Sequence, residues 1–292
     1  MRESQIVLGL DPDPARLWPE ALAAAPSDGT PARRAAAAVQ AHCGALIDAA
    51  GPACVAVKPQ LACFERLGAD GWAALAATVD HARRQGLIVL ADGKRGDIAV
   101  SAAAYAQALV GRTPTPFGAV EGLRADAFTA NPLLGIDALV PLVDGARAAG
   151  AGVFVLVRTS NPGAKDVEDL ELAEARGGAT VWEHLAQIVT QLGGPPSPHS
   201  GLSDVGAVVG ATAPEHVARM RELMPHAPFL LPGIGAQGGR VEDIAPAFAP
   251  GRAGGLVSAS RSIATAHEPT GASPAAAAHA EAERLRAAAW SL

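Results

Sequence analysis

Residues 87–110, LIVLADGKRGDIAVSAAAYAQALV, decide the fold. An aliphatic run over Leu87–Asp92 leads through a charged turn into an Ala-rich stretch, which predicts one strand followed by one helix at 98–110. Polar and apolar residues do not alternate in the strand, as is typical of a strand buried on both faces of a parallel sheet. The stretch therefore predicts one strand–helix unit of a parallel α/β protein.

The same unit recurs along the whole chain. The further strands are expected at Gln5–Leu10, Ala53–Lys58, Asp126–Ala130, Gly152–Arg158, Gly206–Gly210, Pro228–Leu231 and Gly254–Ser258. The further helices are expected near 32–50, 70–86, 135–149, 179–192, 213–224, 240–248 and 275–290. Eight alternating units in roughly 250 residues are typical of a (β/α)8 TIM barrel. A doubly wound open sheet is the alternative, but the turn after the first strand, Asp11–Pro14, lacks the glycines usual there.

The composition restricts the possible classes of function. The chain has 292 residues, of which 49% are hydrophobic, and its net charge is −6, so no basic surface for nucleic acid is expected. It has no apolar stretch long enough for a membrane span or a signal peptide. Cys43, Cys54 and Cys63 have no zinc-site spacing and are expected to be buried, reduced thiols of a cytoplasmic protein.

Charged residues gather where the predicted strands end, which is the active face of a barrel. Only three residues of the chain are lysines, and two of them, Lys58 and Lys94, stand at such ends. Lysine can give up a proton, whereas arginine stays charged. The pattern Asp92-x-Lys94-x-x-Asp97 is the most specific of these signals. Its alternative interpretation is an ion-pair cluster at a helix start, where acids are favoured anyway.

Acids and bases alternate across the first three strand ends, in the order Asp11, Lys58, Asp92 and Lys94. Flanking carboxylates favour the protonated form of a lysine, so this array is expected to hold Lys94 as an ammonium in a dry pocket. A positioned ammonium is a general acid.

The later loops predict a phosphate site. The turn Pro232–Gly239 is rich in glycine, and Arg261 follows the eighth strand; loops in these places commonly bind phosphate in barrels. Ser160 lies in a Thr-Ser-Asn-Pro-Gly turn, and two interpretations of it stay open: a helix N-cap or a contact to the ligand. Residues 161–178 and 193–204 are expected to be inserted loops on the solvent side of a single barrel spanning 1–292. Lys165, in the first of these loops, is expected on the surface.

These motifs resemble those of the orotidine 5′-phosphate decarboxylase family, in its longer bacterial (type 2) branch. The resemblance covers nearly the whole chain and is carried by Gly9–Pro12, Val57–Pro59, Asp92–Ile98, Arg158–Gly163, Pro232–Gly239 and Arg261–Ile263. It implies a homodimeric barrel without metal or organic cofactor. The implied reaction converts orotidine 5′-phosphate to UMP and CO₂, the last step of de novo UMP synthesis.

The resemblance also implies a role for each site residue. Lys94 would protonate C6 of the pyrimidine, Asp92 would lie against the substrate carboxylate, and Asp97 would reach the partner's active site. The other implied contacts are those of Asp11 and Lys58 with the ribose hydroxyls, Ser101 beside Asp97, Ser160 with the pyrimidine amide edge, and Gln237 and Arg261 with the phosphate. Ser101 stands where the family often has threonine, and Ser260 where glycine often precedes the phosphate-binding arginine.

Three other functions compete with this one. Metal-dependent keto-hexulose-phosphate decarboxylases or synthases share the Asp-x-Lys-x-x-Asp pattern, but they carry an acid at the end of the second strand. Lys58 in that position would repel a divalent cation. A Schiff-base aldolase would need a neutral lysine, which flanking acids disfavour. A catalytically silent barrel is the third competitor.

Overall fold

A computed structural model describes residues 3–174, 178–269 and 271–292 of the chain. The strands of its main sheet are β1 (Ile6–Leu10), β2 (Ala56–Pro59), β3 (Ile88–Arg95), β6 (Ala127–Ala130), β7 (Gly152–Arg158), β8 (Val205–Val209), β9 (Phe229–Leu231) and β10 (Gly255–Ala259). They follow the order β1-β10-β9-β8-β7-β6-β3-β2 in a closed barrel. All eight expected strands are thereby confirmed, and an open doubly wound sheet is excluded.

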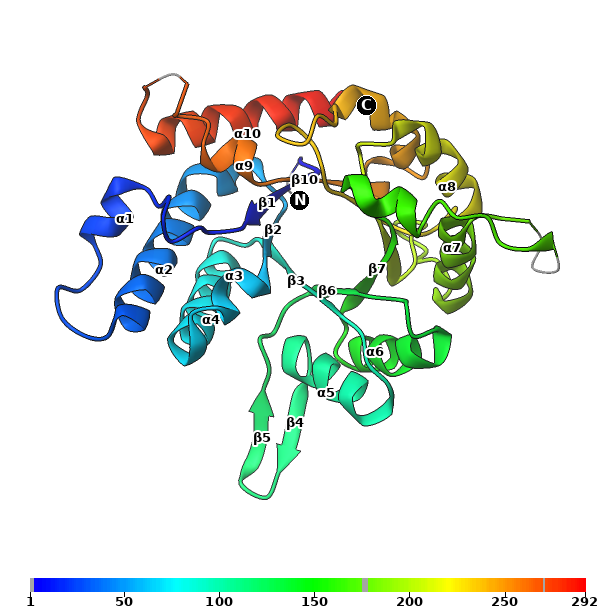
Figure 1. Cartoon of the computed structure of the whole chain (residues 1–292), viewed down its shortest axis with the longest axis horizontal. Coiled ribbons are helices and arrows are strands. Elements are labelled where there is room, and N and C mark those ends of the chain that lie inside the picture. The colour runs from blue at the N-terminus through cyan, green and yellow to red at the C-terminus, as the bar shows by residue number, and fades with distance from the viewer. Residues whose placement is uncertain (1–2, 175–177, 270) are drawn as a thin grey trace. The chain divides into compact units, whose positions relative to one another are not determined.

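Helices follow the strands in the alternation that the sequence predicts (Figure 1). The α-helices are α1 (Pro19–Ala23), α2 (Pro31–Ala50), α3 (Leu61–Glu65), α4 (Gly68–Arg84), α5 (Ala99–Leu109), α6 (Ile136–Ala148), α7 (Val181–Leu192), α8 (Val217–Leu223), α9 (Arg261–Ala264) and α10 (Pro274–Trp290). The 3₁₀ helices include η1 (Gly51–Ala53), η2 (Pro162–Asp166), η4 (Pro214–His216), η5 (Val241–Phe248) and η6 (Arg252–Gly254).

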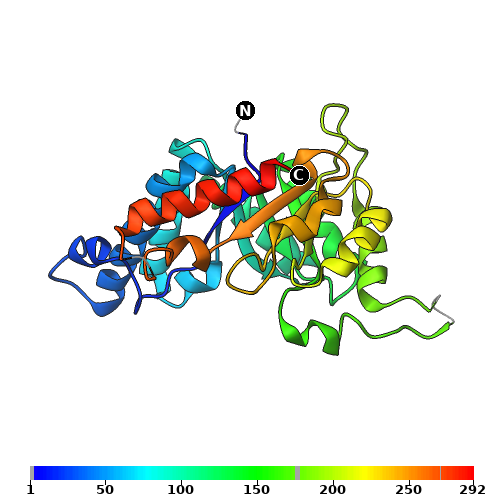
Figure 2. The same ribbon diagram turned by 90° about the horizontal axis from the view of Figure 1, so that it is seen from above.

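The chain forms two compact units. The first comprises Met1–Gly93 and Ala259–Trp290, and the second comprises Lys94–Ser258 with Ser291–Leu292. In the first unit, β1 pairs in parallel with β2 and β2 with β3, in a register that sets Gly9 opposite Lys58. Helix α2 packs against α4 and α10, and Figure 2 shows α10 as the long red helix. Strands β1 and β2 are buried along their length, so their side chains belong to the core of the unit.

The second unit contains the parallel ladder from β6 through β7, β8 and β9 to β10. Its helix α7 begins at a capping box: the Thr180 side chain accepts a hydrogen bond from the Glu183 N–H, and Glu183 accepts one from Thr180. In the first unit, α2 begins similarly, with Thr30 as N-cap and Pro31 at the first helical position. Local sequence therefore sets both helix starts where periodicity predicts them.

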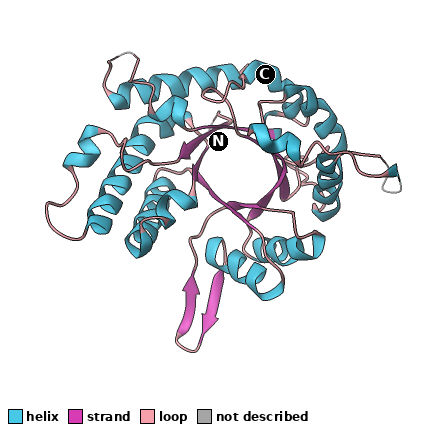
Figure 3. Cartoon of the chain, in the orientation of Figure 1, coloured by secondary structure: helices cyan, strands magenta, loops and turns pink. Residues whose placement is uncertain are grey.

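The structure departs from the expected elements at several points. An antiparallel hairpin of β4 (Arg112–Thr115) and β5 (Gly118–Glu121) lies next to α5 (Figure 3), where no strands were expected. The helix expected at 213–224 is divided into η4 and α8, and the one at 240–248 is the 3₁₀ helix η5, with Pro246 inside it. Cys43 and Cys54 are buried as expected, but Cys63 is only half-buried.

Among the helices of the described residues, none combines the length and the apolar character that a membrane span requires.

Candidate active site

Three charged side chains from the ends of β1, β2 and β3 come together in the first unit. Lys58 Nζ lies 2.6 Å from Asp92 Oδ2 and 4.0 Å from Asp11 Oδ1. The side chains of Lys58 and Asp92 are 8% and 7% exposed, whereas that of Asp11 is 36% exposed. Because a buried charge needs an opposite charge beside it, Lys58 and Asp92 form a buried ion pair. Asp11 is the member of the group that faces solvent.

The environment of Lys58 keeps this lysine protonated. Burial alone would lower the pKa of Lys58, but the negative charges of Asp92 and Asp11, together with the hydrogen bond to Asp92, outweigh it and raise the pKa. Lys58 is therefore a fixed cation at neutral pH.

Gln60 joins this cluster, although the sequence analysis does not name it. Its Nε2 donates to Asp92 Oδ2 at 3.4 Å, and a bridge between Gln60 and Asp92 continues the β2–β3 pairing. The spacing could have predicted this contact. Gln60 follows Lys58 by two residues, and side chains two residues apart lie on the same face of a strand.

Asp11 and Arg261 line one cavity of 440 Å³ in the first unit, together with Trp18, His42 and neighbouring residues. Gly9, on the wall of the same cavity, leaves room for Ser260. A Cβ placed on Gly9 would lie 2.6 Å from the Ser260 Cβ, closer than side chains approach. The serine that departs from the family pattern before Arg261 is therefore accommodated by a glycine on β1.

His42 makes the stability of the first unit depend on pH. It is buried, and its Nδ1 accepts a hydrogen bond from the Trp18 N–H at 3.2 Å. Burial, with a smaller contribution from His267, lowers the pKa of His42 to about 4. The unfolded chain, with an ordinary pKa near 6.5, takes up a proton at mildly acidic pH that the folded chain does not. The stabilisation is therefore complete above pH ~6.5 and is lost as the pH falls towards 4.

We expect this loss to amount to about 3 kcal/mol of unfolding free energy, at ~1.4 kcal/mol per pKa unit. Urea unfolding at pH 7 and pH 4 measures it. His42→Gln keeps an acceptor for Trp18 but has no proton to take up, so this variant should lose about 3 kcal/mol less than the parent on acidification. An equal loss in both proteins would contradict the assignment.

Lys94 is the residue near the end of β3 with an unusual backbone. Its φ is +47°, a left-handed conformation that is uncommon outside glycine. The Lys94 N–H donates to the Oγ1 of Thr129, a fully buried residue of β6, at 2.8 Å. Such conformations persist where surrounding contacts impose them, and they cluster at functional sites. Lys94 itself is exposed.

Asp97 and Ser101 lie at the start of α5. Asp97 is half-buried, and its Oδ1 accepts a hydrogen bond from the Ile98 N–H at 2.8 Å. Ser101 is exposed, as are the apolar neighbours Ile98 and Val100, at 58% and 83%. These side chains are available to a ligand or to a second chain.

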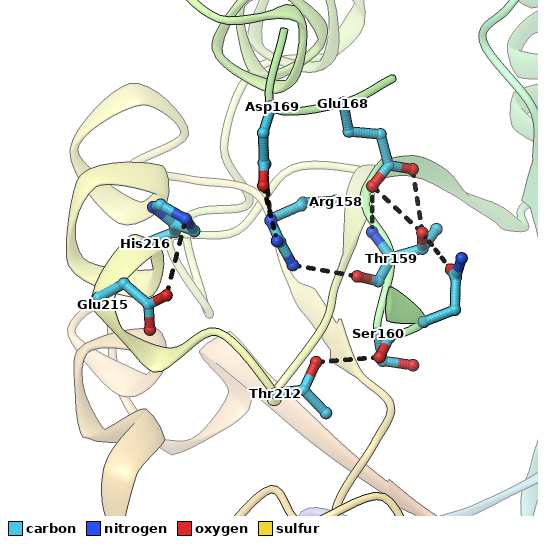
Figure 4. Close-up of polar contacts among 9 residues, drawn as sticks. Arg158, Thr159, Ser160, Glu168, Asp169, Thr212, Glu215 and His216 are labelled. Carbon is cyan, nitrogen blue, oxygen red and sulfur yellow. Dashed lines mark hydrogen bonds and ion pairs between the residues drawn. The ribbon is translucent and has the colours of Figure 1, made fainter. Parts of the chain in front are cut away.

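Ser160 and Gln237 meet around one glycine of the second unit. A Cβ on Gly233 would lie 3.1 Å from Ser160 Cβ and 3.2 Å from Gln237 Oε1, and its φ of +101° also favours glycine. Thr212 Oγ1 donates to the Ser160 carbonyl at 3.0 Å (Figure 4). The N-cap of η2 is Asn161, so the alternative interpretation of Ser160 as an N-cap is wrong.

Each unit brings some of the expected residues together. The first unit joins Asp11, Lys58 and Asp92 and places Arg261 on the cavity of Asp11, while the second unit joins Ser160 and Gln237. Lys165 is exposed, as expected. Within the described residues, no three His, Cys, Asp or Glu side chains form a group that could hold a metal ion.

Comparisons with known proteins show which proteins the chain resembles. The model of the orotidine 5′-phosphate decarboxylase / HUMPS family matches residues 4–276. An orotidine 5′-phosphate decarboxylase of Rhodopirellula baltica is 42% identical, over 80% of this chain and 75% of its own length. An orotidine 5′-phosphate decarboxylase of Haloarcula marismortui is 41% identical, over 91% of this chain and 83% of its own length. Among solved structures, the Leishmania donovani OMP decarboxylase matches this chain with a TM-score of 0.69 and 32% sequence identity. The match covers 98% of this chain and 94% of the Leishmania chain.

Proposed function

The chain belongs to the orotidine 5′-phosphate decarboxylase / HUMPS family, and we propose that Lys94 is the acid with which it decarboxylates orotidine 5′-phosphate. The reaction yields UMP and CO₂, and the enzyme is a carbon–carbon lyase of TIM-barrel fold. The observation that carries the proposal is the buried Lys58–Asp92 pair, with its 2.6 Å contact. It puts a fixed cation at the strand end where metal-dependent relatives would need an acid.

Breaking the C6–carboxylate bond leaves an electron pair on C6 that the pyrimidine ring stabilises little. A cation placed where this charge develops lowers the barrier, because the site is organised before the reaction. In our proposal the Lys94 ammonium gives its proton to C6 as CO₂ leaves, and solvent returns a proton to the amine. Asp92 lies against the departing carboxylate, and Lys58 keeps Asp92 ionised and in place.

Other residues bind the parts of the substrate that do not react. Asp11 and Lys58 contact the ribose hydroxyls, Ser160 the amide edge of the pyrimidine, and Gln237 and Arg261 the phosphate. Binding energy from the distant phosphate holds the reacting end of the substrate in place.

One assay tests the proposed function. The purified protein is treated with EDTA and mixed with orotidine 5′-phosphate, and the ultraviolet absorbance of the pyrimidine is followed. Conversion to UMP at an unchanged rate after chelation supports a reaction that uses no metal. Activity that disappears with EDTA and returns with Mg²⁺ would support the metal-dependent alternative instead.

Arg261→Ala is expected to weaken the binding of UMP by about tenfold to a hundredfold, because a charge-assisted contact to phosphate is lost. The binding of uridine, which has no phosphate, should change little. Isothermal titration calorimetry with both ligands measures the difference. If both ligands lose affinity equally, Arg261 has a structural role in the cavity that it shares with Asp11.

We propose further that the enzyme acts in the cytoplasm as a homodimer with shared active sites. Asp97 and Ser101 of one subunit would complete the site that holds Lys94 of the other. The support is local: Asp97 is only half-buried, and two exposed apolar residues, Ile98 and Val100, follow it closely in the sequence.

Mixing two inactive variants tests the shared site. Lys94→Ala and Asp97→Ala proteins are combined under conditions of subunit exchange. A mixed dimer then has one site with both defects and one site with neither, so activity should return towards one working site per mixed dimer. Native mass spectrometry monitors the exchange. A mixture that exchanges and stays inactive would place Asp97 in its own chain's site.

A further inference from the structure

Residues 161–172 follow β7, and we name them the strap. Two neighbouring carboxylates of the strap, Glu168 and Asp169, turn back onto the end of β7 (Figure 4). The sequence predicts a solvent-side insertion over 161–178, and the contacts of the strap anchor this part of it to the end of β7.

Asp169 anchors the strap to Arg158, the last residue of β7. Its two oxygens accept hydrogen bonds from Arg158 Nε at 3.0 Å and Nη2 at 2.9 Å, a bidentate ion pair. The hydrogen bond from Arg158 lowers the pKa of Asp169, so the pair is ionised at neutral pH. Arg158 Nη1 in turn donates to the Thr159 carbonyl at 3.3 Å. Asp169 therefore orients the arginine that holds the peptide group between Thr159 and Ser160.

Glu168 holds the preceding peptide group. Its Oε2 accepts from the Thr159 N–H at 2.8 Å, and its Oε1 lies 3.0 Å from Thr159 Oγ1. The peptide group after Ser160 is held as well, because the Ser160 carbonyl accepts from Thr212. Three consecutive peptide groups around Ser160 are thus fixed, and the strap controls the first two.

The strap is itself tied to the start of α7. The Trp182 N–H donates to the Glu168 carbonyl, and the Val181 N–H donates to the Leu170 carbonyl, both at 2.9 Å. Space around Ser160 is also limited, because a Cβ on Gly210 would lie 2.8 Å from the Ser160 Cα. The strap is therefore a fixed brace between α7 and the end of β7.

We propose that Glu168 and Asp169 are positioning residues of the decarboxylation, which hold the Thr159–Ser160 backbone so that Ser160 faces the pyrimidine ring. This inference rests on the proposed function, in which Ser160 contacts the amide edge of the base. The two acids act on the peptide groups next to Ser160. We therefore expect them to affect the binding of the base and not the binding of the phosphate or the ribose.

Glu168→Ala is the test, with UMP and ribose 5-phosphate as ligands, since the second lacks the base. We expect UMP to bind about tenfold more weakly, which corresponds to one lost hydrogen bond to a charged group, and ribose 5-phosphate to bind as before. KM for orotidine 5′-phosphate should rise about tenfold, with kcat changed much less. In Glu168→Gln the amide can replace both contacts, with its oxygen on the Thr159 N–H and its NH₂ on Oγ1, so UMP affinity should return to within about twofold of the parent.

Asp166→Ala removes an exposed carboxylate of the same strap and is the matched control, expected to bind both ligands normally. Thermal unfolding of each variant shows that the proteins compared are folded. Unchanged UMP affinity in Glu168→Ala, or an equal loss for UMP and ribose 5-phosphate, would overturn the proposal. Wild-type turnover and the UMP affinity of Ser160→Ala test the proposed function separately. If these behave as expected while Glu168→Ala is normal, only the role of the strap fails.

Discussion

Lys94→Ala is expected to lower kcat for decarboxylation by at least about 10³-fold, because the variant loses both the proton donor and the cation at the developing charge. Binding of UMP should be kept within a few-fold, since the phosphate, ribose and base contacts belong to other residues. Steady-state kinetics on orotidine 5′-phosphate and calorimetric titration with UMP measure the two effects. The largest change therefore falls on the chemical step and not on affinity.

Two further variants make this prediction specific. Lys94→Arg keeps a cation, but arginine does not give up its proton. This variant should therefore decarboxylate at least about 10²-fold more slowly than the parent. Lys165→Ala removes the exposed lysine of the strap and should have normal kinetics. Near-normal turnover in Lys94→Ala would exclude Lys94 from proton transfer.

Lys58→Met should cost about 3–5 kcal/mol of unfolding free energy, because it removes the cation that neutralises the buried Asp92. Urea unfolding at pH 7 measures this loss. The raised pKa of Lys58 adds a second expectation with a definite sign. The stabilisation by this ammonium is complete below the unfolded pKa near 10.4 and disappears as the pH rises through the higher folded value. The parent should therefore lose stability in that alkaline range, and Lys58→Met should lose less.

The double variant Lys58→Met/Asp92→Asn is the control, because it removes both charges at once. We expect it to recover a large part of the loss, since the penalty comes from an uncompensated buried charge. If the single variant is as stable as the parent, the ion pair contributes nothing to the fold.

The barrel was predictable because its strands are buried on both faces and read as short aliphatic runs. The hairpin β4–β5 was not predictable, because it lacks this burial. It is exposed, with Phe117 at its tip 99% accessible, and it contains Pro114 and Pro116, which depress the strand propensity. A buried strand leaves an aliphatic run in the sequence, whereas an exposed hairpin leaves no such pattern.

The candidate site shows the same division. Asp11, Lys58 and Asp92 were predictable, because charged residues that end apolar runs stand out. Thr129 was missed although it is the polar residue within the apolar strand β6, since its contact is with the backbone of Lys94 and not with an ionisable group. Glu168 and Asp169 could not be found, because loop spacing does not show which residues turn back towards Arg158.

The contact between Gly9 and Ser260 links the evolution of two positions 251 residues apart in sequence. A methyl group on residue 9 would have to occupy the volume of the Ser260 side chain, so the two positions share room for one side chain. A lineage that acquires a side chain at the first position must already have glycine at the second. Related sequences should therefore show glycine in at least one of the two positions, and the order of the substitutions along a phylogeny should be constrained accordingly.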